Sequence, residues 1–572
     1  MVGGRRIGSG SWISEAKWMR PQVRSGFVRR RAAAHAGPIL ECARPVGDVG
    51  AHRRRDRLAV DEAVHGRHRS WRSGGSGRRD GTYACDVSEP ETGVAREDEL
   101  QAFRRAAHAL VDGVADHLAA LPSRPVWQQL PDALREQLLD LPLPEHAAAL
   151  DDLVATSLRD VLPHAMGNGH PAFFGWVNPP PSPAGVVASL AAATMNPSVV
   201  AGDHADVHLE RAVVRWLAEL VGFPHAPGAG LLTSGASAAT IVCFAGARGR
   251  ALAAVGHDVR RDGLTGAPQL VAYVPAEAHS CVRRALELLG LGSGAMREVP
   301  LDGGRLDAAA LRALIAADRA SGAVPALLVG SAGTVNAGVI DPLDALADVA
   351  TAEGLWFHVD GAYGAFGVLD PAIAARFRGM ERADSLTLDP HKWLGVPVDA
   401  GCALVRRGDD LRDAFSLIPP YLRQDASALV GTFAEYGFEQ TRPFRALKTW
   451  ATIAARGRAG IAAQVARANG LARELAKLVE REPELELAAV PETSIVAFRA
   501  RPAGCPPSRL DDVNRALSEA VQARGRAFVT GTVFGGRETL RACILHPDTS
   551  SKHLATLVAE VVATARTLAA AG

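Results

Sequence analysis

The sequence predicts an α/β protein whose large domain contains a mainly parallel sheet, with a helical segment before it and a smaller α+β domain after it. The prediction rests on the chain length, on strand-like apolar runs that alternate with helical stretches, and on polar residues that end these runs. At 572 residues, 48% of them hydrophobic and 22% charged, the chain is too long for one hydrophobic core. Two or three domains are therefore expected.

The net charge is small and the cysteines are dispersed. The formal net charge is +1, so no whole-molecule field favours a nucleic-acid or membrane partner. The 7 cysteines form no Cys-x-x-Cys pair, which predicts reduced, mostly buried thiols. No apolar run approaches the roughly 18 residues of a membrane-spanning helix, and the first residues lack the apolar core of a secretory signal. We expect a cytoplasmic protein that binds a small molecule, with no nucleic-acid and no membrane partner.

Residues 1–95 are predicted to form a disordered basic tail. Arg, Gly and Ser dominate this segment, as in Arg29–Arg31 and Ser73–Arg79, and no apolar period is sustained. A basic arm for nucleic acid and a transit peptide are alternatives. A start codon placed too far upstream would also explain residues 1–86.

Residues 96–185 are predicted to be a helical segment. From Glu97 to Val111 apolar residues recur at three and four positions, which is the period of an amphipathic helix. A second helix is expected from Pro144 to Leu162. Beyond Pro183 the chain is Ala-rich and helical up to Gly222, with one helix that starts within Asp203–Glu210.

Residues 186–447 are predicted to form the large domain. Alternating strands and helices favour a parallel sheet covered on both faces, and such sheets bind ligands at the carboxyl ends of their strands. The expected strands are Leu270–Val274, Ala326–Gly330, Leu355–Asp360, Ser385–Leu388 and Gly401–Arg406.

Residues 448–572 are expected to form the smaller α+β domain. This part of the chain is mostly Ala- and Arg-rich helix, with strand-like runs at Ser494–Phe498 and Leu540–Leu545.

Two residues at strand ends point to a particular chemistry. Lys392 follows the strand Ser385–Leu388, and a lysine in an apolar region is costly unless it is paired or used covalently. Asp360 ends the preceding strand. An acid there can keep a proton on the pyridine nitrogen of pyridoxal phosphate (PLP), which makes the ring an electron sink. Taken singly, a solvated lysine and an aspartate in a turn are the ordinary interpretations.

Two further segments add to this pattern. Small residues at Thr233–Thr240 precede a helix, where backbone N–H groups can receive a phosphate and Ser237 can add a hydroxyl donor. Ser and Gly are also common helix caps. His279 follows the strand Leu270–Val274 and opens a helix. It could stack on a cofactor ring or bind a substrate carboxylate, or serve only as a packed or capping residue.

The order of phosphate loop, His279, Asp360 and Lys392 resembles that of the group II PLP-dependent amino-acid decarboxylases, the family of aromatic-L-amino-acid decarboxylase. The likeness runs from about Glu97 to the carboxyl terminus. It implies fold type I, the aspartate-aminotransferase-like fold of PLP-dependent transferases. Further similar blocks are His170–Trp176, His208–Glu210, Gly333–Thr334 and Thr441–Trp450.

The resemblance implies roles for particular residues and no metal. Lys392 would hold PLP as a Schiff base. Asp389 stands where the animal enzymes carry Asn, and an acid beside a phosphate repels it unless it is protonated or turned away. The implied catalytic residues are Lys392, His279, Tyr421 and His391. The implied cofactor contacts are Ala236, Ser237, His279, Thr334, Asp360, Ala362, Ser385, His391 and Lys392.

The resemblance also implies an obligate homodimer, because the family's catalytic loop carries a Tyr, here Tyr421, into the neighbouring subunit's active site. The implied reaction converts an L-amino acid to its amine and CO2. An aromatic substrate is favoured. Glutamate, diaminobutyrate or another acid stays an alternative, because Asn178–Ser182 does not match the aromatic-specific animal pattern. A lyase or aldehyde synthase on the same cofactor, and a non-catalytic PLP-binding protein, are the alternatives.

Overall fold

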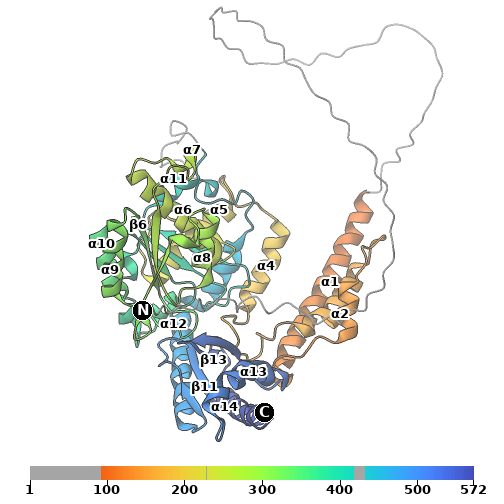
Figure 1. The fold of residues 1–572 in the computed structure, drawn as a ribbon. Coiled ribbons are helices and arrows are strands. Elements are labelled where there is room, and N and C mark those ends of the chain that lie inside the picture. Colours follow the sequence, from red (N-terminus) through yellow and green to blue (C-terminus); the bar gives the residue numbers. More distant parts are fainter. Residues whose placement is uncertain (1–91, 227, 418–431, 572) are drawn as a thin grey trace, which may run out of the picture. The chain divides into compact units, whose positions relative to one another are not determined.

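A computed structural model describes residues 92–226, 228–417 and 432–571 of the chain. Within these ranges a group of helices leads into a central sheet (Figure 1). The expected helical entry is confirmed. Its helices are α1 (Thr92–Ala120), α2 (Asp132–Leu139), α3 (Leu150–Thr156), α4 (Pro183–Met195) and α5 (Ala205–Val221).

Two helix starts differ from the prediction. α1 begins at Thr92, so the end of the predicted tail, 1–95, is helical, and the residues before it lie outside the described ranges. α3 begins at Leu150 and not at Pro144. Two aspartates lie in its first turn, where the helix dipole stabilises acidic side chains. That signal marks the start better than the apolar period does.

The central sheet has seven strands in the order β1-β9-β8-β7-β6-β2-β3. β9 is antiparallel to both of its neighbours, and the other pairs are parallel. The predicted parallel sheet is confirmed. Its strands are β1 (Gly230–Thr233), β2 (Leu270–Pro275), β3 (Met296–Val299), β6 (Val324–Ser331), β7 (Trp356–Asp360), β8 (Ser385–Leu388) and β9 (Gly401–Val405), with a small hairpin of β4 (Leu301–Asp302) and β5 (Arg305–Leu306) beside it.

Helices cover both faces of this sheet. The connections through α6 and α8 advance toward β3, whereas those through α9 and α10 return toward β7. Because parallel crossovers are right-handed, opposite directions place the two pairs of helices on opposite faces. The helices of this domain are α6 (Ala236–Ala254), α7 (Val259–Asp262), α8 (Ser280–Leu288), α9 (Ala308–Ala320), α10 (Leu343–Glu353) and α11 (Gly408–Phe415).

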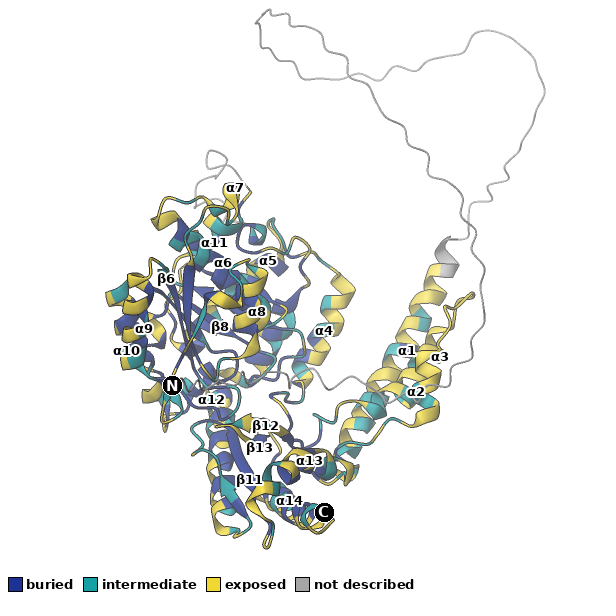
Figure 2. Ribbon diagram, viewed as in Figure 1, coloured by how far each residue is buried: buried dark blue, intermediate teal, exposed yellow. Residues whose placement is uncertain are grey.

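Most strands of the central sheet are buried, as Figure 2 shows in dark blue. Every residue of β1, β2, β8 and β9 is buried. A strand covered on both faces needs apolar residues at nearly every position. This is why the predicted strands appear in the sequence as short continuous apolar runs. Among the described residues, no helix combines the length and apolar composition that a membrane crossing requires.

The carboxyl-terminal part contains a four-stranded antiparallel sheet, of order β10-β11-β13-β12, with helices packed on it. The expected α+β character is confirmed. Its elements are α12 (Arg445–Arg481), β10 (Leu485–Leu487), β11 (Ile495–Ala500), α13 (Leu510–Ala523), β12 (Thr530–Phe534), β13 (Arg537–Cys543) and α14 (Ser551–Ala570).

α12 joins the two hydrophobic cores. It begins at Arg445 and crosses the boundary expected between residues 447 and 448. Ile453, Ile461 and Val465 pack into the core of the large sheet, and Leu475 with other residues near it packs into the second core. The division between the cores therefore lies inside a helix, where no change of composition marks it.

Two buried histidines lie near Gly169: His170 orders its own segment, and His546 links Gly169 to the carboxyl-terminal part. His170 Nδ1 accepts the backbone N–H of Ala172 at 2.9 Å, and burial lowers the pKa of His170 to about 4. His546 Nδ1 accepts the N–H of Asp548 at 3.0 Å, and its Nε2 lies 2.9 Å from the carbonyl oxygen of Gly169. Burial also lowers the pKa of His546. Both rings are therefore neutral in the folded protein at pH 7.

The lowered pKa of His170 predicts that the folded protein loses stability in acid. The pKa of His170 is about 4 in the folded protein, against 6.5 for an ordinary histidine, so the unfolded chain takes up its proton first as pH falls. The stabilisation is fully present above about pH 6.5 and is lost progressively toward pH 4. We expect the melting temperature to fall by a few degrees more between pH 7.5 and 5.0 in the wild type than in His170→Gln. Equal falls in the two proteins would contradict this role of His170.

Candidate functional site

The predicted site residues meet at one edge of the central sheet. β1, β8, β7, β6 and β2 run in the same direction, so their carboxyl ends share an edge. Ala236 follows β1, Lys392 follows β8, Asp360 ends β7, Thr334 follows β6 and His279 follows β2. This edge is where α/β sheets bind their ligands.

Lys392 is paired with an acid. Its Nζ lies 3.0 Å from Oδ2 of Asp389, and the lysine side chain is largely buried. Nε2 of His391 lies 3.7 Å from the same oxygen. The Asp389 carboxylate therefore lies close to two groups that can carry a proton, the Lys392 amine and the His391 ring.

His391 is held by backbone groups of Ala400. Its Nδ1 accepts the N–H of Ala400 at 3.2 Å, and its own N–H donates to the Ala400 carbonyl at 3.3 Å. Burial lowers the pKa of His391, although the Asp389 charge opposes the shift. The ring is therefore neutral at pH 7, and its Nε2 carries the proton that faces Asp389 (3.7 Å).

The amino terminus of α6 has backbone N–H groups that can bind an anion. Ala236 is its first residue, Gly235 is its N-cap without a side-chain cap, and Ser237 is exposed. The N–H of Ala236 donates to Oδ1 of Asp389 at 2.6 Å. A helix amino terminus binds anions through such unpaired N–H groups, and here a carboxylate already occupies one of them.

Glycines allow this close approach. A Cβ at Gly401 would lie 2.4 Å from the backbone of Gly235, so no larger residue fits at the start of β9. A Cβ at Gly235 would point toward His391 and Asp389, at 3.5 and 3.7 Å. The space in front of α6 is therefore part of the site and is bordered by these two side chains.

Asp360 is oriented by its neighbours. Its Oδ1 accepts the N–H of Ala362 at 3.1 Å and lies 3.5 Å from the Thr387 hydroxyl on β8. Ala362 is buried, and its carbonyl accepts the N–H of Asp389 at 3.1 Å. Ala362 thus connects the acid on β7 with the segment that carries Lys392.

Thr334 and His279 border the site from β6 and β2. The Thr334 hydroxyl is buried and accepts the N–H of Val339 at 3.1 Å, which leaves its own proton for another acceptor. His279 is the N-cap of α8 and is exposed, and its Nδ1 accepts the N–H of Cys281 at 3.2 Å. The capping role foreseen for His279 is therefore observed, with Nε2 carrying the proton.

One of the predicted residues, Ser385, does not join this group. Ser385 begins β8, at the opposite end of the strand from Lys392, and is fully buried. Its hydroxyl lies 2.7 Å from Nε1 of Trp356 and 2.8 Å from Nδ1 of His358. These partners come from the start and middle of β7, so Ser385 packs below the site. Tyr421 lies outside the described residues.

The structure adds two features that the sequence did not suggest. Arg541 on β13 is 9% exposed and donates to the carbonyl of Val335, next to Thr334, at 2.8 Å, so a cation from the carboxyl-terminal sheet borders the site. Trp393 stacks on Tyr363 with ring centroids 5.0 Å apart and fixes the residue after Lys392. No local pattern could reveal either, because both depend on contacts between distant segments.

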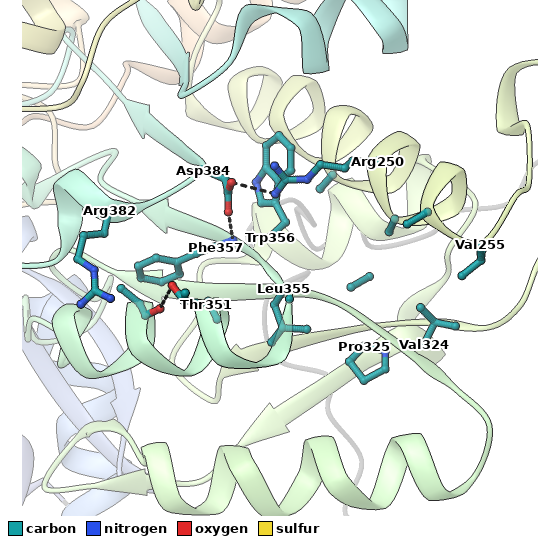
Figure 3. Close-up of a pocket in the computed structure, with 17 residues that line it drawn as sticks. Arg250, Val255, Val324, Pro325, Thr351, Leu355, Trp356, Phe357, Arg382 and Asp384 are labelled. Carbon is teal, nitrogen blue, oxygen red and sulfur yellow. Dashed lines mark hydrogen bonds and ion pairs between the residues drawn. The ribbon is translucent and has the colours of Figure 1, made fainter.

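A cavity of about 510 Å³ lies at the other edge of the sheet (Figure 3). It is lined by the starts of β6 and β7 and by the ends of α6 and α10. The Arg250 guanidinium lies 4.2 Å above the Trp356 ring and 2.9 Å from Asp384. None of the predicted site residues lines this cavity, so it is separate from the group around Lys392.

Within the described ranges, no three His, Cys, Asp or Glu side chains are placed to hold a metal ion.

Comparisons with known proteins agree with this arrangement. A model of the pyridoxal-dependent decarboxylase conserved domain matches residues 131–501. The aromatic-L-amino-acid decarboxylase of Bacillus atrophaeus is 31% identical over 471 residues, which cover 81% of this chain and 95% of that protein. The phenylacetaldehyde synthase of Arabidopsis thaliana is 28% identical, with 81% and 95% covered.

Solved structures give the same result. Oryza sativa TDC with PLP and tryptamine has a TM-score of 0.74 at 27% identity and covers 82% of this chain and 98% of that chain. Catharanthus roseus tryptophan decarboxylase in complex with L-tryptophan has a TM-score of 0.73 at 25% identity, with 82% and 98% covered. The likeness therefore extends over nearly the whole of these relatives.

Proposed function

The chain belongs to the pyridoxal-dependent decarboxylase family, and we propose that it converts an aromatic L-amino acid to its amine and CO2. One observation carries the proposal: an amine, Lys392, and an acid, Asp360, lie at the ends of two adjacent parallel strands, beside a helix amino terminus that accepts an anion. This donor set fits PLP. When bound, PLP accepts the electron pair of the bond that breaks as CO2 leaves.

Each residue at the edge has a proposed task. The N–H of Ala236 and the hydroxyl of Ser237 receive the phosphate at the amino terminus of α6. Thr334 offers its hydroxyl proton from β6. Lys392 would attach the cofactor covalently. Asp360 would keep the proton on the pyridine nitrogen of the cofactor.

The remaining proposed contacts are two histidines, His279 and His391, and the backbone of Ala362. His279 and His391 both accept a backbone N–H at Nδ1, so both present an Nε2 proton. His279 is exposed at the start of α8, where it can lie on the cofactor ring or bind the substrate carboxylate. Ala362 contributes through the backbone contacts that orient Asp360 and Asp389.

An aromatic substrate is supported by the segment that contains Trp176. Trp176 is 44% exposed and has a positive φ of 44°, a conformation that non-glycine residues adopt at a cost. The rings of Phe173 and Phe528 lie 6.2 and 5.4 Å from its ring and hold it in place. The family resemblance implies that Trp176–Pro183 form part of the substrate pocket, and an exposed ring that two buried rings support suits an aromatic side chain there. Structural relatives crystallised with tryptamine and L-tryptophan support the same choice.

The test is a panel of the twenty common L-amino acids with dopa and diaminobutyrate, scored for CO2 release by the purified protein with added PLP. We expect release from one or more aromatic amino acids and at least about tenfold less from glutamate or diaminobutyrate. No release from any amino acid would overturn the proposal. Release from glutamate or diaminobutyrate alone would overturn the substrate class and leave the reaction intact.

Aldehyde formation is the second candidate, because the relatives include the phenylacetaldehyde synthase noted above. We assign Tyr421 as the acid that returns a proton to the α-carbon after CO2 leaves, which favours the amine. Positioned acids contribute about 10²–10⁴-fold. We therefore expect Tyr421→Phe to slow amine formation by that factor and, with dissolved O2 as the two-electron oxidant that is reduced to H2O2, to release some aldehyde and ammonia. Aldehyde as the main wild-type product would make this second candidate the correct one.

We also propose that the protein is a homodimer. Apolar side chains are exposed in the leading helical segment, and Figure 2 shows in yellow that much of α1 is exposed. Surfaces of this kind mark protein–protein contacts. The exposed side chains include Leu100, Phe103, Val111, Leu139, Leu143, Val187 and Leu190. A solution mass equal to one chain, measured by light scattering, would contradict the dimer.

A cytoplasmic location is proposed from the thiols. Cys243, Cys281, Cys402 and Cys543 are buried, and Cys505 is partly buried; all five are free thiols. Free thiols are typical of a reducing compartment. Fractionation of the source cells that recovered the protein outside the cytoplasm would contradict this.

A further inference from the structure

We infer that Asp389 competes with the phosphate of PLP: its carboxylate occupies the amino terminus of α6 in the cofactor-free protein and has to leave it when PLP binds. The inference rests on the proposed assignment of that helix end to the phosphate. It concerns how tightly and how reversibly the cofactor is held, which the proposed reaction does not address.

The first observation is the position of the carboxylate. Oδ1 of Asp389 accepts the N–H of Ala236 at 2.6 Å, across 153 positions of sequence. Asp389 is 3% exposed, so water does little to stabilise its charge. A buried carboxylate needs such donors, and a helix amino terminus is a favourable place for one.

The second observation is the partner of the other oxygen. Oδ2 of Asp389 lies 3.0 Å from Nζ of Lys392 and 3.7 Å from Nε2 of His391. One carboxylate therefore engages both the helix end proposed for the phosphate and the amine proposed for covalent attachment. Each oxygen of the Asp389 carboxylate therefore has a polar partner from one of these two groups.

A phosphate at α6 changes this balance. The phosphate carries negative charge and seeks the same N–H group that Asp389 holds. Two anions within a few ångströms in a buried site repel each other, and interactions of this kind shift ionisation equilibria by 1–3 pKa units, or about 10- to 1000-fold. The backbone anchors of Asp389 stay in place, because its N–H is bound to the Ala362 carbonyl at 3.1 Å. Only the side chain can move away.

Asp389→Asn tests the competition directly. Asn keeps an oxygen acceptor of the same size for the Ala236 N–H but has no charge. We expect the dissociation constant of PLP, measured by spectral titration of the cofactor-free protein, to fall about tenfold. Pyridoxal has the same ring and aldehyde without the phosphate, so its dissociation constant reports only the loss of the ion pair with Lys392 and should fall clearly less than that of PLP. Thermal unfolding of the cofactor-free variant should show a lower melting temperature, because the ion pair with Lys392 is lost.

Ser237→Ala serves as the matched control for the site itself. It should weaken PLP and leave pyridoxal binding unchanged, because it removes a proposed phosphate donor. If Ser237→Ala behaves in this way and Asp389→Asn weakens PLP, or changes PLP and pyridoxal equally, the competition is refuted while the phosphate site stands. If Ser237→Ala affects PLP and pyridoxal alike, the assignment of α6 to the phosphate fails, and the inference fails with it.

Discussion

Lys392→Ala is expected to abolish covalent attachment of PLP and to reduce decarboxylation by at least about 10³-fold. The variant loses the amine proposed to bind the cofactor and a group placed to carry a proton at the reacting centre. It also leaves the Asp389 carboxylate without the ammonium that lies 3.0 Å away in the wild type. The measurement is borohydride reduction followed by mass spectrometry of the peptide that contains position 392, with the rate of CO2 release measured on the same sample.

Lys448→Ala is the matched control for attachment. Lys448 is also largely buried and also lies near an aspartate, with Nζ 3.6 Å from Asp399. It is outside the group at the sheet edge, so the borohydride adduct should persist in this variant. A reducible adduct in Lys392→Ala would show that another amine holds the cofactor.

Asp360→Asn is expected to reduce decarboxylation by about 10³-fold while PLP stays bound. Asn still accepts the N–H of Ala362, which Oδ1 of Asp360 does at 3.1 Å, so the local backbone should be preserved. Without the negative charge the pyridine nitrogen is no longer held in its protonated form, and the ring loses its capacity as an electron sink. Loss of one positioned electrostatic group typically costs about 10²–10³-fold or more.

The measurement is single-turnover CO2 release at saturating PLP, with bound cofactor quantified in the same preparation. Asp384→Asn is the control. Asp384 accepts the N–H of Phe357 and pairs with Arg250 at the opposite edge of the sheet, so its loss should affect stability and not turnover. Near-normal turnover in Asp360→Asn would remove Asp360 from the reaction.

The sequence predicted the structure well wherever the residues of one segment alone determine its conformation and burial. The predicted strands of the central sheet, which correspond to β2, β6, β7, β8 and β9, each appear as a continuous apolar run. β3, which contains Arg297 and Glu298 and is mostly not buried, was missed. β8 is predicted to the residue, and α5 starts within the expected range. β12 was missed because it is half exposed and has no continuous apolar run. The Gly535-Gly536 pair after it, with both φ angles positive, is a hairpin signal that could have revealed it.

The sequence by itself therefore determined the fold class, the cofactor chemistry and the residues that end the strands, because strand burial and the short motif around Lys392 are local properties. Only the tertiary structure decided which of these residues meet. It placed Ser385 below the site, and it brought Arg541 from the carboxyl-terminal sheet to its border. It also brought Asp389 into contact with Ala236, since this contact depends on how β1 and β8 are placed around β9. Contacts between segments more than a hundred residues apart arise from packing, and no local pattern encodes them.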